Sequence, residues 1–270
     1  MRTAYLLYEQ KDAALNHAFI SQLQQAARTH EIDLQLKILE QFNEEIDVQP
    51  FFVWNRTRNH AIAEQFEARE IRVFNNSKAN MLANEKLLAQ HYAKALGIPS
   101  IESFTERPRT LEFPFVVKSV DWHGGKEVFL CENEAQHEEA QDQLQTVLYQ
   151  PYIESNSTDV RLWMLGVDVF AAVKRSGQNS FKSNYTLGGS IEKFDVPKEL
   201  TQYVKTMADN LQSDYIGIDF IIGVDGQFYF NELEDPVGAR SYYELYDRDL
   251  PVLLMAYICR CLGEVVHQIE

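Results

Sequence analysis

The segment from residue 215 to residue 240 (YIGIDFIIGVDGQFYFNELEDPVGAR) constrains the possible fold more than any other, because it predicts a β-hairpin. Alternating apolar residues lead into a Val-Asp-Gly turn, and residues 227–233 form the returning strand. Asp219 and Glu232 lie at nearly equal distances along the chain from that turn, so their carboxylates are expected to face one another. Glu234 follows Glu232 at the two-residue spacing that keeps both side chains on one face of a strand.

Three carboxylates on one face of a sheet repel one another unless cations lie between them. Their oxygen atoms suit Mg²⁺, which commonly binds one or two carboxylates and completes its coordination with water and phosphate oxygens. The alternative is a solvated polar face, which we favour for Asp225 at the turn. Because apolar neighbours place Asp219, Glu232 and Glu234 in strand interiors, these three residues are predicted to form a metal site.

The charge balance of the chain argues against several classes of partner. Its 270 residues include 40 Asp and Glu against 25 Lys and Arg, a formal net charge of −15. A general nucleic-acid binder needs a basic surface, so no nucleic-acid partner is expected. No apolar run approaches the roughly 20 residues of a membrane helix, and the N-terminus has no apolar signal region, so no membrane is expected either. Three cysteines, an odd number, suit reduced thiols in a cytoplasmic protein.

The first 77 residues predict a small α/β domain with a mostly parallel sheet, because strand-like and helix-like patterns alternate along them. One strand is expected at residues 51–54, and Arg56 and Arg58 follow it. Open α/β sheets bind ligands at that carboxyl end, so the two arginines are candidates to hold a substrate carboxylate or a phosphate. The alternative is an exposed loop, where arginine is common. No GxGxxG motif supports a dinucleotide site.

Two lysines are candidates for phosphate contacts. Lys86 lies in a helix predicted from residue 80 to residue 96, where by itself it would be an ordinary surface lysine. Lys118 ends an apolar strand ahead of a loop with two glycines, whose backbone N–H groups can approach a phosphate closely. That loop contains His123, Gly124, Gly125 and Lys126. Gly-Gly hairpins are common, so the motif is weak on its own.

A basic segment accompanies a second predicted hairpin, at residues 159–166 and 169–175. Between residues 161 and 182 one acidic residue accompanies four basic residues, which are Arg161, Lys174, Arg175 and Lys182. In so acidic a chain, a basic cluster together with a carboxylate cluster suggests a bound polyanion with a metal. Helices are predicted from the apolar residues at 200–211 and 254–269.

Taken together and in this order, four segments resemble the ATP-grasp superfamily and, within it, the RimK-like carboxylate–amine ligases. They are NEKLLAQHYAKALGIP, FPFVVKSVDWHGGKEVFL, DVRLWMLGVDVFAAVKR followed by FKSNYTLGGS, and GIDFIIG with FNELEDPVG. The resemblance covers about residues 78 to 240, and its most specific part is the D-x-R…K-R…F-x-S-N…G-G run. It implies an ATP-grasp fold, α/β overall and α+β in the ligase part. The expected divisions are a pre-ATP-grasp domain (1–77), a lid subdomain (78–150) and a C-terminal subdomain (151–270).

The resemblance also implies a role for each candidate residue. ATP would contact Lys86, Lys118, His123, Gly124, Gly125, Lys126, Gln150, Tyr152, Ile153, Lys174 and Asn184, with residues 150–153 as the adenine hinge. The residues facing phosphate or the reacting carboxylate would be Arg161, Lys174 and Arg175. Two Mg²⁺ ions, or Mn²⁺ in their place, would bind Asp219, Glu232 and Glu234. Apart from the resemblance, Arg240 is a candidate to hold a substrate carboxylate, because it lies just past the metal-binding strand, and Arg56 and Arg58 are further candidates.

Two positions depart from the family pattern. Glu127 stands where the loop usually has a second glycine, which changes the expected shape of that loop. Glu234 stands where the family usually has asparagine. This second departure preserves an oxygen ligand and adds a negative charge, so metal binding is expected to survive.

The reaction implied by the resemblance begins when a substrate carboxylate attacks the γ-phosphorus of ATP, giving an acyl-phosphate and ADP. An amine then displaces phosphate and leaves an amide or peptide bond. Fixed cations and Mg²⁺ suit this chemistry, which needs no side-chain nucleophile. The alternatives are a small-molecule kinase on the same scaffold and a non-catalytic ATP-binding module. The expected partners are small-molecule or peptide carboxylates and amines, and the candidate assemblies are a homodimer and a homotetramer.

Overall fold

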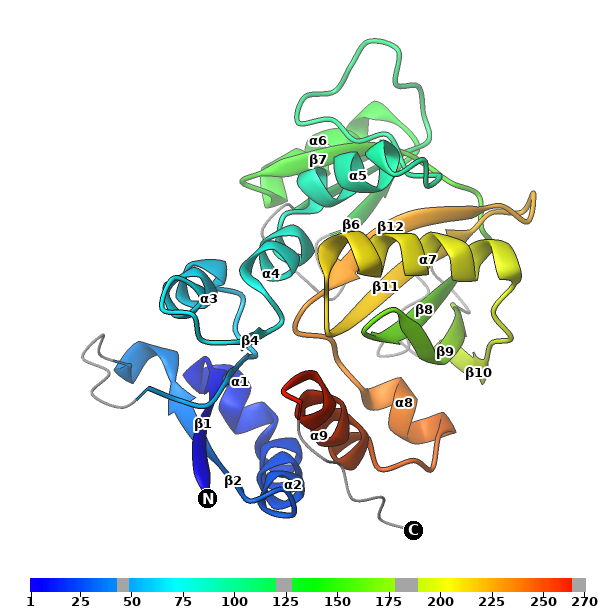
Figure 1. Ribbon diagram of the computed structural model, residues 1–270. Helices are drawn as coiled ribbons and strands as arrows, with labels where there is room; N and C mark the ends of the chain where they lie inside the picture. The colour runs from blue at the N-terminus through cyan, green and yellow to red at the C-terminus, as the bar shows by residue number, and fades with distance from the viewer. Residues whose placement is uncertain (43–48, 120–127, 178–188, 264–270) are drawn as a thin grey trace.

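The computed structural model describes residues 1–42, 49–119, 128–177 and 189–263, which form three β-sheets that follow one another along the chain (Figure 1). The mixed α/β class predicted from the sequence is therefore confirmed. Within the described residues, no helix has both the length and the apolar character needed to cross a membrane.

The first sheet has four parallel strands, as the alternating pattern predicted. In sheet order they are β2 (Ile32–Ile38), β1 (Arg2–Tyr8), β3 (Val53–Asn55) and β4 (Val73–Phe74). The accompanying helices are α1 (Gln10–Leu15), α2 (His17–Arg28), the 3-10 helix η1 (Leu39–Gln41) and α3 (His60–Glu67). Alternate residues of β1 are buried on opposite faces: Leu6 packs in the core that includes α2, and Leu7 in the core that includes α3. Arg56 directly follows β3 at the carboxyl edge of this sheet.

The single helix predicted at residues 80–96 is wrong, because the structure has two helices there, α4 (Ser77–Asn84) and α5 (Lys86–Ala95). They are separated by Glu85, whose backbone is not helical (φ −118°, ψ 85°). The Asn84 side chain donates hydrogen bonds to the carbonyls of Asn80 (2.8 Å) and Asp235 (2.9 Å), and so ties the end of α4 to the predicted hairpin. The break makes Lys86 the first residue of α5.

The second sheet is antiparallel, with strands β6 (Val128–Cys131), β5 (Phe115–Ser119) and β7 (Val147–Pro151). Helix α6 (Glu134–Gln143), which the apolar pattern did not predict, accompanies it. The helix buries only His137 and Ala140, so it has no apolar stripe to detect. Its start is marked instead by Asn133, whose side chain accepts a hydrogen bond from the backbone of Gln136.

The third sheet has five antiparallel strands and contains both predicted hairpins. In order they are β10 (Ser190–Lys193), β9 (Asp168–Ser176), β8 (Thr158–Leu165), β11 (Tyr215–Ile222) and β12 (Phe228–Glu234). Helix α7 (Lys198–Leu211), predicted from its periodicity, buries Leu200, Val204 and Met207 in a core shared with β8 and β11. The facing position of Asp219 and Glu232 in β11 and β12 is confirmed, and a bulge follows at Phe220.

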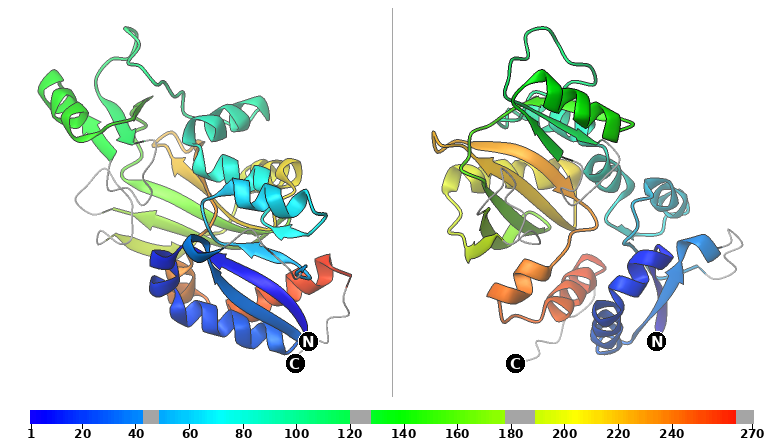
Figure 2. Two further views of the ribbon diagram at one scale, coloured as in Figure 1. Left: turned by 90° about the vertical axis from the view of Figure 1, so that its left-hand side faces the viewer. Right: turned by 180° about the vertical axis from the view of Figure 1, so that it is seen from behind.

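The chain ends with α8 (Arg240–Leu245) and α9 (Leu250–Cys261). Leu254 and Ile258 of α9 join one core with Leu23 of α2, so α9 lies beside the first sheet (Figures 1 and 2). The last helix predicted from the sequence extended to residue 269, and its final residues lie outside the described part. The core that includes α2 also contains Trp163 of β8, so it joins the first and third sheets.

Candidate active site

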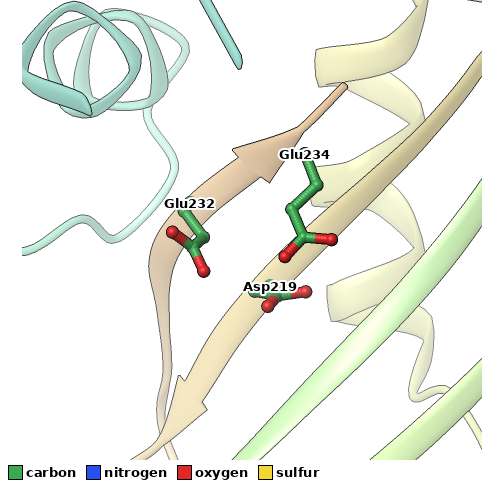
Figure 3. A group of neighbouring side chains, drawn as sticks. All are labelled: Asp219, Glu232 and Glu234. Atoms are coloured by element: carbon green, nitrogen blue, oxygen red, sulfur yellow. The ribbon is translucent and has the colours of Figure 1, made fainter. Parts of the chain in front are cut away.

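The three predicted carboxylates meet on one face of the central hairpin (Figure 3). One ligand oxygen from each of Asp219, Glu232 and Glu234 lies within 4.8 Å of the others. Asp219 is fully buried, and the Glu234 side chain keeps 24% exposure. The facing register of β11 and β12 brings Asp219 to Glu232, and the period of two along β12 adds Glu234.

Two arginines from the neighbouring strands bind these carboxylates. Arg161 of β8 donates from Nε to Asp219 Oδ1 (2.8 Å) and from Nη2 to Asp219 Oδ2 (2.7 Å), and Nη2 also bonds Glu234. Arg175 of β9 donates from Nε and Nη2 to the two carboxylate oxygens of Asp159 (2.5 and 2.8 Å), and Nη2 also donates to Asp219 Oδ2 (2.7 Å). The result is an alternating series of charges, Asp159–Arg175–Asp219–Arg161–Glu234.

Asp159 is a member of this series that the sequence reasoning missed. It lies on the same strand as Arg161 at a two-residue spacing, which places both side chains on one face of β8. The predicted hairpin also pairs Asp159 with Arg175 across β8 and β9. The D-x-R spacing and this register together were the signal that could have revealed it.

The series controls the ionisation of its members. Burial alone would raise the pKa of Asp219, but Arg161 and Arg175 outweigh burial and lower that pKa to about 2. For Glu234, burial comes first and the charges of Asp219 and Glu232 add to it, so its pKa rises to about 7 despite the opposing effect of Arg161. Three carboxylates thus share two arginines, and Glu232 adds a further negative charge beside Glu234, at the partly exposed end of the series.

That donor set fits a hard divalent cation. It offers carboxylate oxygens alone, with close spacing, partial exposure at Glu232 and Glu234 and an excess of negative charge. Asp219, Glu232 and Glu234 are therefore the described residues suited to hold Mg²⁺.

The two candidate lysines come from elements outside the five-stranded sheet that carries the carboxylates. Lys118 of β5 and Lys86 of α5 are both buried, and Lys86 Nζ donates to the carbonyl of Ser119 (3.2 Å). Burial lowers the pKa of Lys118 to about 8, with Glu232 opposing that shift and Lys86 adding to it. These electrostatic couplings show that the tertiary fold brings Lys118 near both Lys86 and the carboxylate face.

The other residues predicted to contact ATP are only partly described. Gln150 is buried in β7 and donates from Nε2 to Ser103 Oγ (2.7 Å), while Tyr152 and Ile153 are partly buried just beyond that strand. The remaining predictions in this group lie outside the described residues: His123, Gly124, Gly125, Lys126 and Asn184, together with Glu127 and Lys182.

The structure separates Lys174 from Arg175. Successive residues of a strand point to opposite faces of a sheet, so the side chains of these two neighbours on β9 lie on different faces. Arg175 enters the carboxylate series, whereas Lys174 pairs with Glu192 of β10 (3.1 Å). The basic segment that the sequence suggested is therefore divided between two faces.

The three arginines expected to hold substrate have different surroundings. Arg56 is 5% exposed and donates to the Val237 carbonyl (3.0 Å) and to the Tyr8 hydroxyl (3.4 Å). Arg58 is partly exposed and pairs with Asp12 (2.8 Å). Arg240 is exposed at the start of α8. Arg56 thus connects the first sheet to the segment between β12 and Arg240.

Comparison with known proteins identifies the family. Residues 75–258 match the family model described as "RimK-like ATP-grasp domain". The protein named "Uncharacterized protein MG011" from Mycoplasma genitalium is 24% identical over 254 residues, covering 90% of this chain and 88% of that protein. Human N-acetylaspartylglutamate synthase A is 27% identical over 166 residues, covering 60% of this chain and 42% of that protein.

A solved structure supports the fold assignment. The ATP-grasp ligase PsnB, in a complex with a phosphomimetic variant of its minimal precursor, Mg and ADP, superimposes with a TM-score of 0.70. The identity is 14%, with 98% of this chain and 99% of that chain covered. The chain therefore belongs to the RimK-like ATP-grasp family, an ATP-binding group of ligases that form carbon–nitrogen bonds.

Proposed function

We propose that this ligase joins a carboxylate to an amine through an acyl-phosphate, with release of ADP and phosphate. The observation that carries the proposal is the position of Lys118, a buried lysine whose pKa is lowered to about 8, near both Lys86 and Glu232. Among the described residues no carboxylate forms an ion pair with Lys118, and a polyphosphate is a suitable counter-charge. Phosphate-binding cations therefore face a carboxylate set suited to the metal ions that accompany ATP.

Each group in the site has a proposed task. Lys86 and Lys118 hold ATP phosphates, and Asp219, Glu232 and Glu234 hold two Mg²⁺ ions, for which Mn²⁺ can substitute. The bound metal supplies charge neutralisation at the transferred phosphoryl group. Arg161 and Arg175 keep Asp219 ionised and oriented. A direct side-chain nucleophile is not needed, because the substrate carboxylate attacks ATP itself.

The remaining candidates are assigned roles by the resemblance and by their chemistry. The adenine hinge consists of Gln150, Tyr152 and Ile153. The loop at residues 123–126 and Asn184 are proposed to complete the nucleotide site, whereas Lys174, on the opposite face of the sheet from Arg175, is not part of it. Arg240, Arg56 and Arg58 are the proposed substrate side, and the excess of guanidinium groups there favours carboxylate-bearing substrates, either small molecules or peptides. We further propose the division at residues 77 and 150, a cytoplasmic location and a homodimeric or homotetrameric assembly.

Hydroxylamine trapping tests the proposed chemistry. The protein is incubated with ATP, Mg²⁺ and a panel of candidate acids in the presence of hydroxylamine, which captures an acyl-phosphate as a hydroxamate. We expect a coloured hydroxamate with one acid class, together with equal amounts of ADP and phosphate. Omitting Mg²⁺ is the matched control and should abolish both signals.

Two other outcomes would identify a different reaction. Release of AMP and pyrophosphate would replace the acyl-phosphate by an adenylate. A stable phosphorylated product that accumulates without any amine would make the protein a kinase. Absence of ATP binding by calorimetry would contradict both enzymatic readings.

A further inference from the structure

Arg161 spans two of the three carboxylates that we assign to the metal. Its Nε and Nη2 atoms hold both oxygens of Asp219, at 2.8 and 2.7 Å, and Nη2 also bonds Glu234 Oε1. Its side chain keeps 12% exposure, so these charge-assisted bonds are largely shielded from water. The guanidinium therefore bonds oxygens of two of the three residues that a divalent cation would use.

The two carboxylates are held with different strength. Asp219 is fully buried and accepts three N–H bonds, two from Arg161 and one from Arg175. Glu234 is 24% exposed, and among the described residues Arg161 is the cation that bonds it. Glu234 can therefore exchange its partner at lower cost than Asp219.

We propose that Arg161 and a divalent cation compete for Glu234, so that Arg161 is a positioning residue that also sets the metal affinity of the site. This inference rests on the proposed function, because the assignment of Asp219, Glu232 and Glu234 to a metal belongs to that proposal. An oxygen bound to a guanidinium N–H offers less electron density to a metal, and the two positive charges repel each other at this range. Metal binding then releases one Nη2–H of Arg161 while its bonds to Asp219 remain.

The released N–H has a second consequence. With a metal bound, Arg161 would keep its bonds to Asp219 and would have one Nη2–H donor no longer bonded to Glu234. A phosphoryl or carboxylate oxygen is a suitable acceptor for that donor. Metal binding and anion binding would thus favour one another, and this coupling is reciprocal.

The test is the affinity for Mn²⁺ alone, measured on the full chain without nucleotide from the electron paramagnetic resonance signal of free Mn²⁺. Arg161→Lys keeps the positive charge but removes the planar fork that spans two carboxylates. If the competition exists, this variant frees Glu234 and binds Mn²⁺ about fivefold or more tightly than the wild type. Unchanged or weaker binding overturns the proposal.

Two further variants isolate Glu234. Arg175→Lys is the matched control, because Arg175 also bonds Asp219 but pairs with Asp159 at its other end and does not bond Glu234; it should tighten Mn²⁺ binding less than Arg161→Lys does. In a Glu234→Gln background, Arg161→Lys should lose its effect. An equal gain from both lysine variants, or a gain that persists with Glu234→Gln, contradicts competition at Glu234.

A measurement on the wild type covers the case in which Arg161→Lys fails to fold. In protein labelled with ¹⁵N-arginine, Mg²⁺ should shift or broaden the Nη–H signals of Arg161 while its Nε–H signal, bonded to Asp219, changes little. Mg²⁺ binding with no change in the Nη–H signals contradicts the proposal.

The outcomes also separate this inference from the proposed function. A wild-type protein that takes up no Mn²⁺, with or without ADP, refutes both. If Mn²⁺ binds and hydroxamate forms but Arg161→Lys has wild-type affinity, the ligase reaction stands and the competition alone is refuted.

Discussion

Buried cations on the two sides of the candidate site are compensated in opposite ways. On the five-stranded sheet, burial alone would lower the pKa values of Arg161 and Arg175, but the carboxylates beside them outweigh it and raise both. On the three-stranded sheet, burial dominates and lowers the pKa of Lys118 to about 8. Within the described residues, carboxylates therefore compensate the two arginines, whereas they do not fully compensate Lys118.

This difference suits a site whose arginine–carboxylate geometry is fixed while a lysine can still bind an anion. Buried ion pairs fix geometry when each charge has its partners, and breaking one leaves an uncompensated charge in the interior. Lys118 forms no ion pair with a carboxylate of the described residues, so its burial is expected to weaken the folded state slightly and an anion is expected to favour its charged form. Glu232 couples to Lys118 and faces Asp219 across the hairpin, so it belongs to both sides.

The largest effect is expected at this shared residue. Glu232→Gln keeps the shape of the side chain but removes the charge that both sides use, so Mg²⁺-dependent hydroxamate formation should fall at least about 100-fold. Folding should be unchanged, as checked by circular dichroism. Asp225→Asn, in the turn of the same hairpin, is the control and should keep wild-type activity. Full activity of Glu232→Gln would mean that the carboxylates form only a polar face.

Breaking the arginine side should cost stability. Arg175→Gln leaves Asp159 and Asp219 buried without one of their partners, and the free energy of unfolding in urea should fall by about 3–5 kcal/mol. Arg58→Gln is the matched control, because its pair with Asp12 is partly exposed and should contribute less than about 1 kcal/mol. Similar losses in the two variants would show that the buried series is not compensated as described.

Replacing the lysine should weaken ATP binding without lowering the free energy of unfolding. Lys118→Met keeps most of the side-chain volume and removes a charge that burial disfavours, so the free energy of unfolding should stay constant or rise. Affinity for ATP should fall about 10- to 100-fold by calorimetry, because a buried phosphate contact is lost. A destabilised variant with normal ATP affinity would place Lys118 among the structural cations, together with the arginines.

The smallest expected effect is a pH dependence confined to the lysine side. The lowered pKa of Lys118, about 8, means that the free protein loses this charge as pH rises through 8, while bound phosphate favours the charged form. ATP affinity should therefore decrease about tenfold between pH 7 and pH 9. Lys118→Arg, which stays charged over this range, should flatten the profile. A profile that is equally steep in the variant would assign the titration to another group.

The sequence predicted those features that depend on local spacing. The period of two along β12 and the distances of Asp219 and Glu232 from the turn placed three carboxylates on one face before any tertiary contact was known. The parallel first sheet followed from alternating strand and helix patterns. Helix α6 was not predicted, because it is polar and buries only His137 and Ala140, too few residues to form an apolar stripe.

Features that depend on competing tertiary contacts could not be predicted. The pattern at residues 80–96 was continuous, but the bond from Asn84 to the Asp235 carbonyl accompanies a break at Glu85 that no propensity indicated. Lys174 and Arg175 looked like one basic cluster, although the strand turns them to opposite faces. The pairing of Arg56 with the Val237 carbonyl joins residues 181 positions apart.

By itself, the sequence determined the hairpin and its three carboxylates, because period-two spacing and turn chemistry act over a few residues; the order of four motifs carried the resemblance to carboxylate–amine ligases. Tertiary structure alone decided which cations the protein neutralises and which it leaves for a ligand. Lysine and arginine at the ends of apolar strands look alike in a sequence. Whether each one meets a carboxylate depends on sheet register and on packing between distant segments, as Asp159 and Asp219 show for Arg175.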